Sequence, residues 1–120
     1  MFLRQSEFLP DLYMGEVFFE TRIPLLFLCF DSKDNKYICS CHQADNKKRE
    51  WVLAPISECR IRELQSNIIT IREVFEVDEL YVVTLKGFPV EPIIHKVNRE
   101  DLAEEILPTA GYFLDGSGVY

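Results

Sequence analysis

An unbroken run of apolar residues, from residue 23 to residue 30, constrains the fold of this chain more than any other feature. A strand with one solvated face alternates apolar and polar residues, whereas an unbroken apolar strand is covered on both faces. The run is far too short for a membrane-spanning helix, which needs about 20 residues. We therefore expect a central strand of a sheet, with Pro24 near its start because proline cannot donate a ladder hydrogen bond.

Polar turns separate this run from other segments that are typical of strands. Residues 12–21 read as a strand, with Tyr13, Val17 and Phe19 predicted on one face and the acidic Glu16 and Glu20 on the other. Pro55 is expected to end a short strand, and Pro92 to restrict a late strand to the sheet edge. The remaining predicted strands are residues 37–44, 51–54, 80–85 and 90–97.

Three short helices are predicted from N-capping residues that stand between apolar staple positions. The capping residues are Ser57, for a helix to about Gln65, Thr70 with Glu73 in a capping box, and Asn98 with Asp101. Strands followed by helices, without regular alternation, indicate an α+β fold. We expect a mostly antiparallel, curled sheet of about five or six strands, with two or three short helices packed on one face.

The apolar pattern also predicts a core and a domain boundary. Residues 1–108 are expected to form a single compact domain, and residues 109–120 an aromatic, glycine-containing tail. The predicted anchors of this tail are Tyr112, Phe113, Leu114 and Tyr120, either on the domain itself or on a neighbouring chain. The predicted core residues are Leu26, Phe27, Leu28, Phe30, Ile38, Trp51, Leu53, Ile61, Leu64, Val74, Phe75, Val82 and Leu85.

The chain is acidic, with 13 Lys plus Arg against 20 Asp plus Glu and a formal charge of −7. This balance argues against nucleic-acid binding, which depends on neutralising phosphates with basic side chains. Lys47, Lys48 and Arg49 form the only basic run, and a solvated hairpin tip explains them best. Residues 58–120 carry 12 acidic and 6 basic side chains. This excess either keeps the protein soluble or attracts a basic partner surface.

Cys39, Cys41 and His42 are the densest group of chemically versatile side chains. Cys39 and Cys41 share one face of the predicted strand, whereas His42 points to the other, so a Cys–His nucleophile pair needs a distorted strand. A turn with an even number of residues would place Cys29 on the face opposite the two cysteines. An odd turn or a bulge would bring all three cysteines together. Zinc binding is the weaker interpretation and buried core cysteines the stronger one.

Other catalytic signatures are absent from the sequence, and no cofactor is expected. No glycine-rich loop opens a helix after a strand, so the chain has no phosphate-binding loop of that kind. Glu100 and Asp101 are explained by the dipole of the helix that they begin. The sequence leaves enzymatic activity open but favours a protein without one.

Several segments together resemble a family of small uncharacterised bacterial domains, a domain of unknown function. The segments are IPLLFLCFD, WVLAPISECRIRELQSN, IITIREVF and LPTAGYFLD. They consist of packing and capping residues rather than a catalytic motif, and the family brings no established activity. The resemblance implies a compact bacterial domain of accessory character.

These observations favour a small acidic, non-enzymatic interaction protein: an accessory subunit, inhibitor or adaptor of a larger bacterial partner. We expect a protein partner or self-association, no membrane, no nucleic acid and a cytoplasmic location, because the first residues lack the apolar core of a signal peptide. The alternative is a small metal-binding protein or enzyme that uses Cys39, Cys41 and His42.

Overall fold

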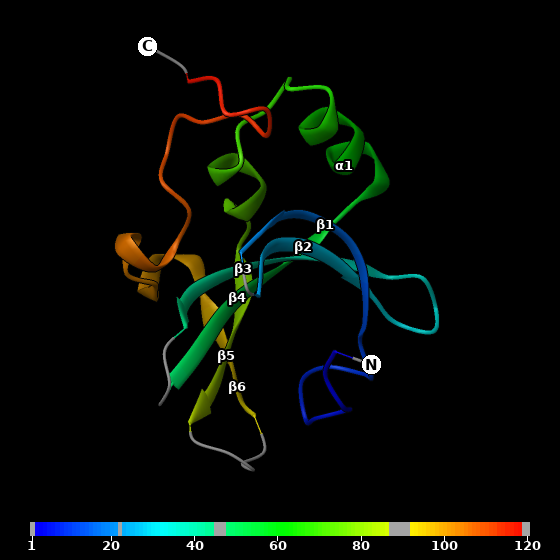
Figure 1. Ribbon diagram of the computed structural model, residues 1–120. Helices are drawn as coiled ribbons and strands as arrows, with labels where there is room; N and C mark the ends of the chain where they lie inside the picture. Colours follow the sequence, from blue (N-terminus) through cyan, green and yellow to red (C-terminus); the bar gives the residue numbers. More distant parts are fainter. Residues whose placement is uncertain (1, 22, 45–47, 87–91, 119–120) are drawn as a thin grey trace.

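The computed structural model describes residues 2–21, 23–44, 48–86 and 92–118, and its strands form a single six-stranded sheet (Figure 1). Each strand lies next to the strand that follows it in the chain, and all neighbouring pairs are antiparallel. The strands are β1 (Tyr13–Glu20), β2 (Pro24–Phe30), β3 (Lys36–Ala44), β4 (Lys48–Ile56), β5 (Glu79–Lys86) and β6 (Ile93–Asn98). The predicted antiparallel sheet is therefore confirmed.

The sheet is strongly curled, and β1 and β2 run across the direction of β5 and β6 (Figure 1). β1 and β6 form its two edges, so the predicted edge position of the last strand is confirmed. Residues 90 and 91 of that predicted strand lie outside the described residues. Pro55 lies inside β4 rather than after it. The register between β4 and β5 ends at Leu53 and Tyr81, so the proline has no hydrogen bond to donate on that side.

The described chain contains fewer helices than predicted. Only α1 (Glu58–Gln65) is α-helical, and the other two capped segments form short 3₁₀ turns. The segment after Thr70 forms η1 (Arg72–Phe75). The segment after Asn98 forms η2 (Arg99–Asp101) and η3 (Glu104–Ile106). A cap satisfies the first backbone donors but does not supply the packing that extends a helix, and 3₁₀ geometry is typical of such short pieces.

Two of the three predicted caps still make their hydrogen bonds. Ser57 Oγ accepts from the backbone N–H of Arg60 at 3.2 Å. Thr70 and Glu73 form a reciprocal capping box: the Thr70 N–H donates to Glu73 Oε1 at 3.0 Å, and the Glu73 N–H to Thr70 Oγ1 at 3.3 Å. Asn98 instead donates from its side chain to Asp101 Oδ2 at 3.5 Å and caps no backbone group. The third cap was therefore wrong.

Apolar side chains cover both faces of the sheet, as the unbroken run in β2 predicted. The helix-side core lies under α1, η1 and the chain after β6. It contains Leu26, Leu28, Ile38, Val52, Ala54, Ile56, Ile61, Leu64, Ile69, Val74, Phe75, Leu80, Leu102 and Leu107. The opposite core contains Leu3, Leu9, Leu12, Phe27, Cys29, Cys39, Trp51, Leu53 and Val83. Alternate residues of β2 thus belong to different cores.

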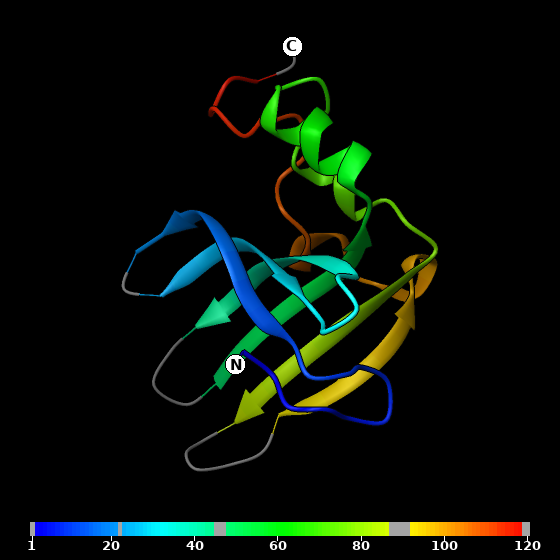
Figure 2. The ribbon, with the colours of Figure 1, turned by 90° about the vertical axis from the view of Figure 1, so that its right-hand side faces the viewer.

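The first residues of the chain cover the second face, which the sequence did not predict. In Figures 1 and 2 this N-terminal segment lies beside the sheet, away from α1 and the C-terminal stretch. Phe30 is a wrong core prediction: it ends β2, is 37% exposed and stacks on Tyr13 with ring centroids 5.8 Å apart. Val82 and Leu85 are only half-buried.

Candidate functional site

The outer edge of β1 is the most unusual surface of the described chain. β1 pairs with β2 on one side, and among the described residues no backbone hydrogen bond joins its other side to a further strand. Tyr13 is 37% exposed, and Met14 and Phe19 are each 41% exposed. An edge strand with exposed apolar side chains is a ready template for pairing with another chain.

The pairing of β1 with β2 is irregular beyond Met14. The register with β2 shifts between Met14 and Val17, between Val17 and Phe19, and again before Glu20. A bulge inserts an extra residue and changes which face the following side chains occupy. Val17 and Phe18 pack against opposite cores, as successive strand residues do, whereas Phe19 is exposed. The predicted shared face of Tyr13 and Phe19 is therefore not a buried one.

The surroundings of this edge are acidic. Glu16 and Glu20 of β1 are exposed, and Glu16 Oε2 accepts a hydrogen bond from Gln65 Nε2 of α1 at 3.0 Å. Asp11 precedes the strand and accepts from the Gln5 N–H at 2.6 Å. We call the exposed residues Tyr13, Met14, Glu16, Phe19, Glu20 and Phe30 the β1 edge surface. It combines an open backbone ladder, large apolar side chains and negative charge.

The opposite edge, β6, has a different character. His95 and Lys96 are both exposed, as is Ile93 at 49%, and Lys96 Nζ pairs with Glu79 Oε2 of β5 at 2.9 Å. The hydrogen bond to Glu79 raises the pKa of Lys96, so the ammonium stays charged. Charged side chains, lysine above all, discourage strand addition at an edge. β6 thus exposes a lysine where β1 exposes glutamates.

The predicted C-terminal anchors are held by the chain's own backbone contacts. The Tyr112 carbonyl accepts from the Ile71 N–H at 2.8 Å, and the Phe113 N–H donates to the Ser117 carbonyl at 2.8 Å. Leu114 packs against the helix-side core and Phe113 is half-buried, whereas Tyr112 is 49% exposed. Tyr120 lies outside the described residues. Within the described tail, only the Tyr112 ring offers a large apolar surface.

The cysteines are placed by an odd turn. Phe30 pairs with Lys36 across residues 31–35, so Cys29 lies opposite Tyr37 and on the same face as Cys39. Of the two alternatives that the sequence left open, the odd turn is the one present. The Sγ atoms of Cys29 and Cys39 are 3.2 Å apart, and burial raises the pKa of the Cys39 thiol.

Cys41 and His42 complete the predicted group without forming a metal centre. Cys41 is half-buried, and His42 Nε2 lies 4.0 Å from Glu50 Oε1. Among the described residues, no three His, Cys, Asp or Glu side chains are arranged to hold a metal ion. The structure brings Cys29 and Cys39 together but adds no histidine or carboxylate to them.

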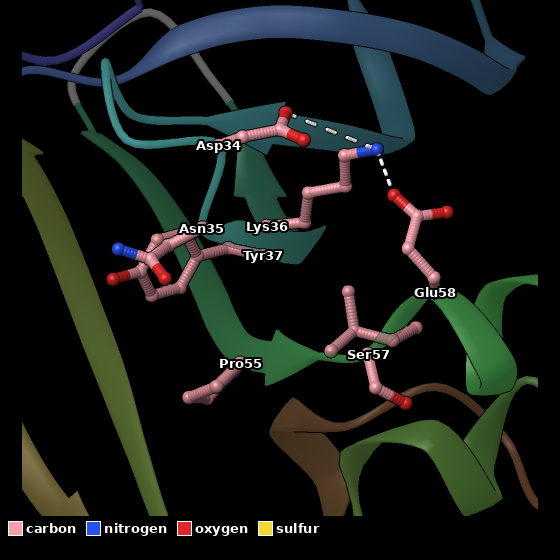
Figure 3. A pocket seen from close by; sticks show the side chains of 8 residues that line it. Asp34, Asn35, Lys36, Tyr37, Pro55, Ser57 and Glu58 are labelled. Atoms are coloured by element: carbon pink, nitrogen blue, oxygen red, sulfur yellow. Dashed lines mark hydrogen bonds and ion pairs between the residues drawn. The ribbon is translucent and has the colours of Figure 1, made fainter.

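A shallow depression of about 480 Å³ lies beside the turn between β2 and β3 (Figure 3). Its floor includes Tyr37 and Pro55, and Lys36 reaches between Asp34 and Glu58. Lys36 Nζ forms an ion pair with Glu58 and lies 4.0 Å from Asp34 Oδ1. The hydrogen bond to Glu58 raises the pKa of Lys36, so the amine stays protonated and is a poor nucleophile.

Comparisons of the chain with protein-family models, curated proteins and solved structures found no match. In the described part of the chain, no helix is long and apolar enough to cross a membrane. Functional inference therefore rests on the geometry of the surfaces described above.

Proposed function

We propose that this chain is a small acidic, non-enzymatic interaction protein that binds an extended segment of a larger bacterial partner along the β1 edge surface. The open outer edge of β1, with Tyr13, Met14 and Phe19 exposed beside it, is the observation that carries this proposal. In this role the protein serves as an accessory subunit, inhibitor or adaptor in the cytoplasm.

Strand addition would use both the open backbone ladder and the exposed apolar side chains of this surface. The partner's main chain pairs with the open ladder, and its alternate side chains contact the exposed apolar residues. β1 has 8 residues and so offers a ladder of about 27 Å. Tyr13 and Phe30 are already stacked, which provides a rigid aromatic platform at one end of the ladder.

The charge of the edge specifies the partner's chemistry. Glu16 and Glu20 are exposed on β1, and the whole chain has a formal charge of −7. Opposite charges on neighbouring strands stabilise their pairing, whereas like charges directly opposite destabilise it. A strand with Lys or Arg at alternate positions is therefore favoured. A second copy of β1 is disfavoured because it would bring its own glutamates to the same edge.

The exposed ring of Tyr112 belongs to the same proposal as a second contact area. Phe113 and Leu114 support it by packing toward the domain. A partner bound along the β1 edge surface would reach the Tyr112 ring only by extending across α1 as well. We therefore assign the main contribution to β1.

The alternative, a metal protein or enzyme using Cys39, Cys41 and His42, has less support. Cys39 is fully buried, and burial raises its pKa, which disfavours the thiolate that binds metals and attacks substrates. Metal analysis of the reduced protein tests this alternative directly. One zinc ion per chain would favour it over the interaction role.

Binding of designed peptides tests the proposal. An eight-residue peptide alternating Lys and Val is titrated against the protein, and backbone amide exchange is measured for each strand. We expect protection of β1 amides and weaker binding at high salt, and no binding of the matched peptide with Glu in place of Lys. Protection confined to another element, or equal binding of the Glu peptide, would contradict the proposal.

Two variants localise the effect. Phe19→Lys places a positive charge on the open edge and is expected to abolish binding of the Lys–Val peptide. Ile68→Lys introduces the same charge at a residue that is 66% exposed outside the sheet, and it should leave binding unchanged. Because both side chains are exposed, neither change removes core packing.

A further inference from the structure

Two cysteine thiols meet in the core opposite the helices. Cys29 of β2 and Cys39 of β3 are both 0% exposed, and their Sγ atoms are 3.2 Å apart. The two residues are diagonal neighbours, because Cys29 pairs with Tyr37 and Cys39 with Phe27. Diagonal neighbours ordinarily stand farther apart than directly opposite residues, so both side chains lean toward each other.

We propose that Cys29 and Cys39 are a disulfide-forming pair whose oxidation is controlled by the opening of the N-terminal cover, residues 2–12. A disulfide bond is about 2.05 Å long, so the sulfur atoms need to approach by only about 1.2 Å from their observed separation of 3.2 Å. This inference is independent of the proposed binding role of β1.

The N-terminal cover packs in the same core as the pair. Phe2 contacts Phe27 and Trp51 edge to face, with ring centroids 5.0 and 5.7 Å apart. Leu9 is buried in the same core, 2% exposed. The ends of the cover are joined by backbone hydrogen bonds between Leu3 and Leu12, at 3.2 Å and 2.8 Å.

The physical properties of this cover suit it to act as a gate. It consists of one irregular segment with few backbone hydrogen bonds, and such segments open at a lower free energy than the strands beneath them. While it is closed, burial raises the pKa of the Cys39 thiol and excludes oxidants. Opening exposes both thiols to solvent. The thiols can then ionise, and oxidants can reach them.

The oxidant that we assign is a small-molecule disulfide such as oxidised glutathione. One cysteine thiolate attacks it, forming a mixed disulfide and releasing one glutathione thiolate. The second cysteine thiolate then displaces the remaining glutathione and closes the Cys29–Cys39 bond. The protons of the two cysteines end on the two glutathione molecules released, so two thiols are oxidised as one disulfide is reduced.

The test uses a Cys41→Ser, Cys59→Ser variant, in which Cys29 and Cys39 are the only thiols. The folded protein is incubated with oxidised glutathione, then denatured in an alkylating reagent and weighed by mass spectrometry. We expect a product that has lost two hydrogens, carries no alkyl group and retains no glutathione. Complete alkylation at both thiols, or a lasting mixed disulfide, would overturn the proposal.

Two further variants of this background test the gate. Leu9→Ala weakens the cover and should speed disulfide formation at least tenfold. Leu64→Ala weakens the helix-side core instead. When the two variants are compared under conditions that give them equal free energies of unfolding, Leu64→Ala should speed disulfide formation less than Leu9→Ala does. Equal rates in the two variants would show that oxidation needs global unfolding and would refute the gate. Cys29→Ser in the same background must prevent the cyclised product.

Discussion

The two faces of the sheet are covered in different ways. On the helix side, an ion network ties η1 to the chain after β6, and hydrogen-bonded caps begin α1 and η1. In that network Arg99 donates to Glu76 at 2.9 and 3.0 Å and to Glu104 at 3.0 Å. Arg72 pairs with the same two glutamates and donates to the Pro108 carbonyl at 3.0 Å. On the other side, the N-terminal cover relies mainly on apolar contact.

This difference teaches that the stability of the molecule is not uniform. The helix-side cover is linked to the sheet through several elements, so its loss requires most of the fold to open. The N-terminal cover is one segment that can detach while the six strands stay paired. Variants on the two faces should therefore differ in how far the structural change spreads as well as in how much free energy of unfolding they lose.

The largest effect is expected for Phe75→Ala on the helix side. Phe75 is the last residue of η1 and is fully buried, so its removal leaves a large cavity and should cost about 3–5 kcal/mol of the free energy of unfolding. Urea denaturation followed by circular dichroism measures the change. A loss below about 1 kcal/mol would mean that this core collapses around the gap and that the helix side is not the rigid face.

The matching change on the other face, Leu9→Ala, should be smaller and more local. Leu9 is buried, but the cover can relax toward the space that its side chain leaves, so we expect about 2 kcal/mol. Amide exchange should accelerate in residues 2–12 before it changes in β3 and β4. If exchange accelerates uniformly across the sheet, the N-terminal cover is as cooperative as the helix side and the comparison fails.

Sequence patterns predicted those features that depend on near neighbours. The Ser57 cap and the Thr70–Glu73 box were visible because their partners lie three residues away. The doubly covered β2 was visible because burial on both faces leaves an unbroken apolar run. Helix length was not predictable in this way, because it depends on what each capped segment packs against.

Features that depend on pairing register were missed. The bulges in β1 break its alternation, and the local signal for the first of them, Gly15 inside the strand, was not used. The odd number of residues in the β2–β3 turn depends on Asp31. Its carboxylate accepts hydrogen bonds from the N–H groups of Lys33 and Asn35, each at 2.9 Å, and these bonds hold the five-residue turn. The N-terminal cover was missed because polar residues interrupt its three buried leucines.

The N-cap of α1 offers a test of intermediate size on the helix side. Ser57→Ala removes the acceptor of the Arg60 N–H and should cost about 1 kcal/mol. Ser66→Ala, at the other end of α1, is the matched control because Ser66 bonds through its backbone N–H. Thermal denaturation of both variants measures the difference. Equal losses would show that α1 is held by tertiary packing alone.

The smallest effect concerns the ion network, tested by Glu76→Gln and by pH. The hydrogen bonds from Arg99, and then from Arg72, lower the pKa of Glu76 below its ordinary value of 4.5. A lowered pKa in the folded state means that the native protein binds this proton less readily than the unfolded chain. The resulting stability is present above pH 4.5 and is lost as the pH falls through the folded-state pKa.

Because Glu76 is partly exposed, the contribution at neutral pH is at most about 1 kcal/mol. Glu76→Gln should therefore lower the free energy of unfolding slightly at pH 7, and the difference from the unaltered protein should vanish in acid. Glu105→Gln, an exposed carboxylate of η3 outside these contacts, should show no such pH dependence. A Glu76→Gln effect that persists unchanged in acid would mean that side-chain packing, not the paired charge, links Glu76 to the C-terminal stretch. The contrast between an ion-linked face and an apolar-covered face would then lose its electrostatic basis.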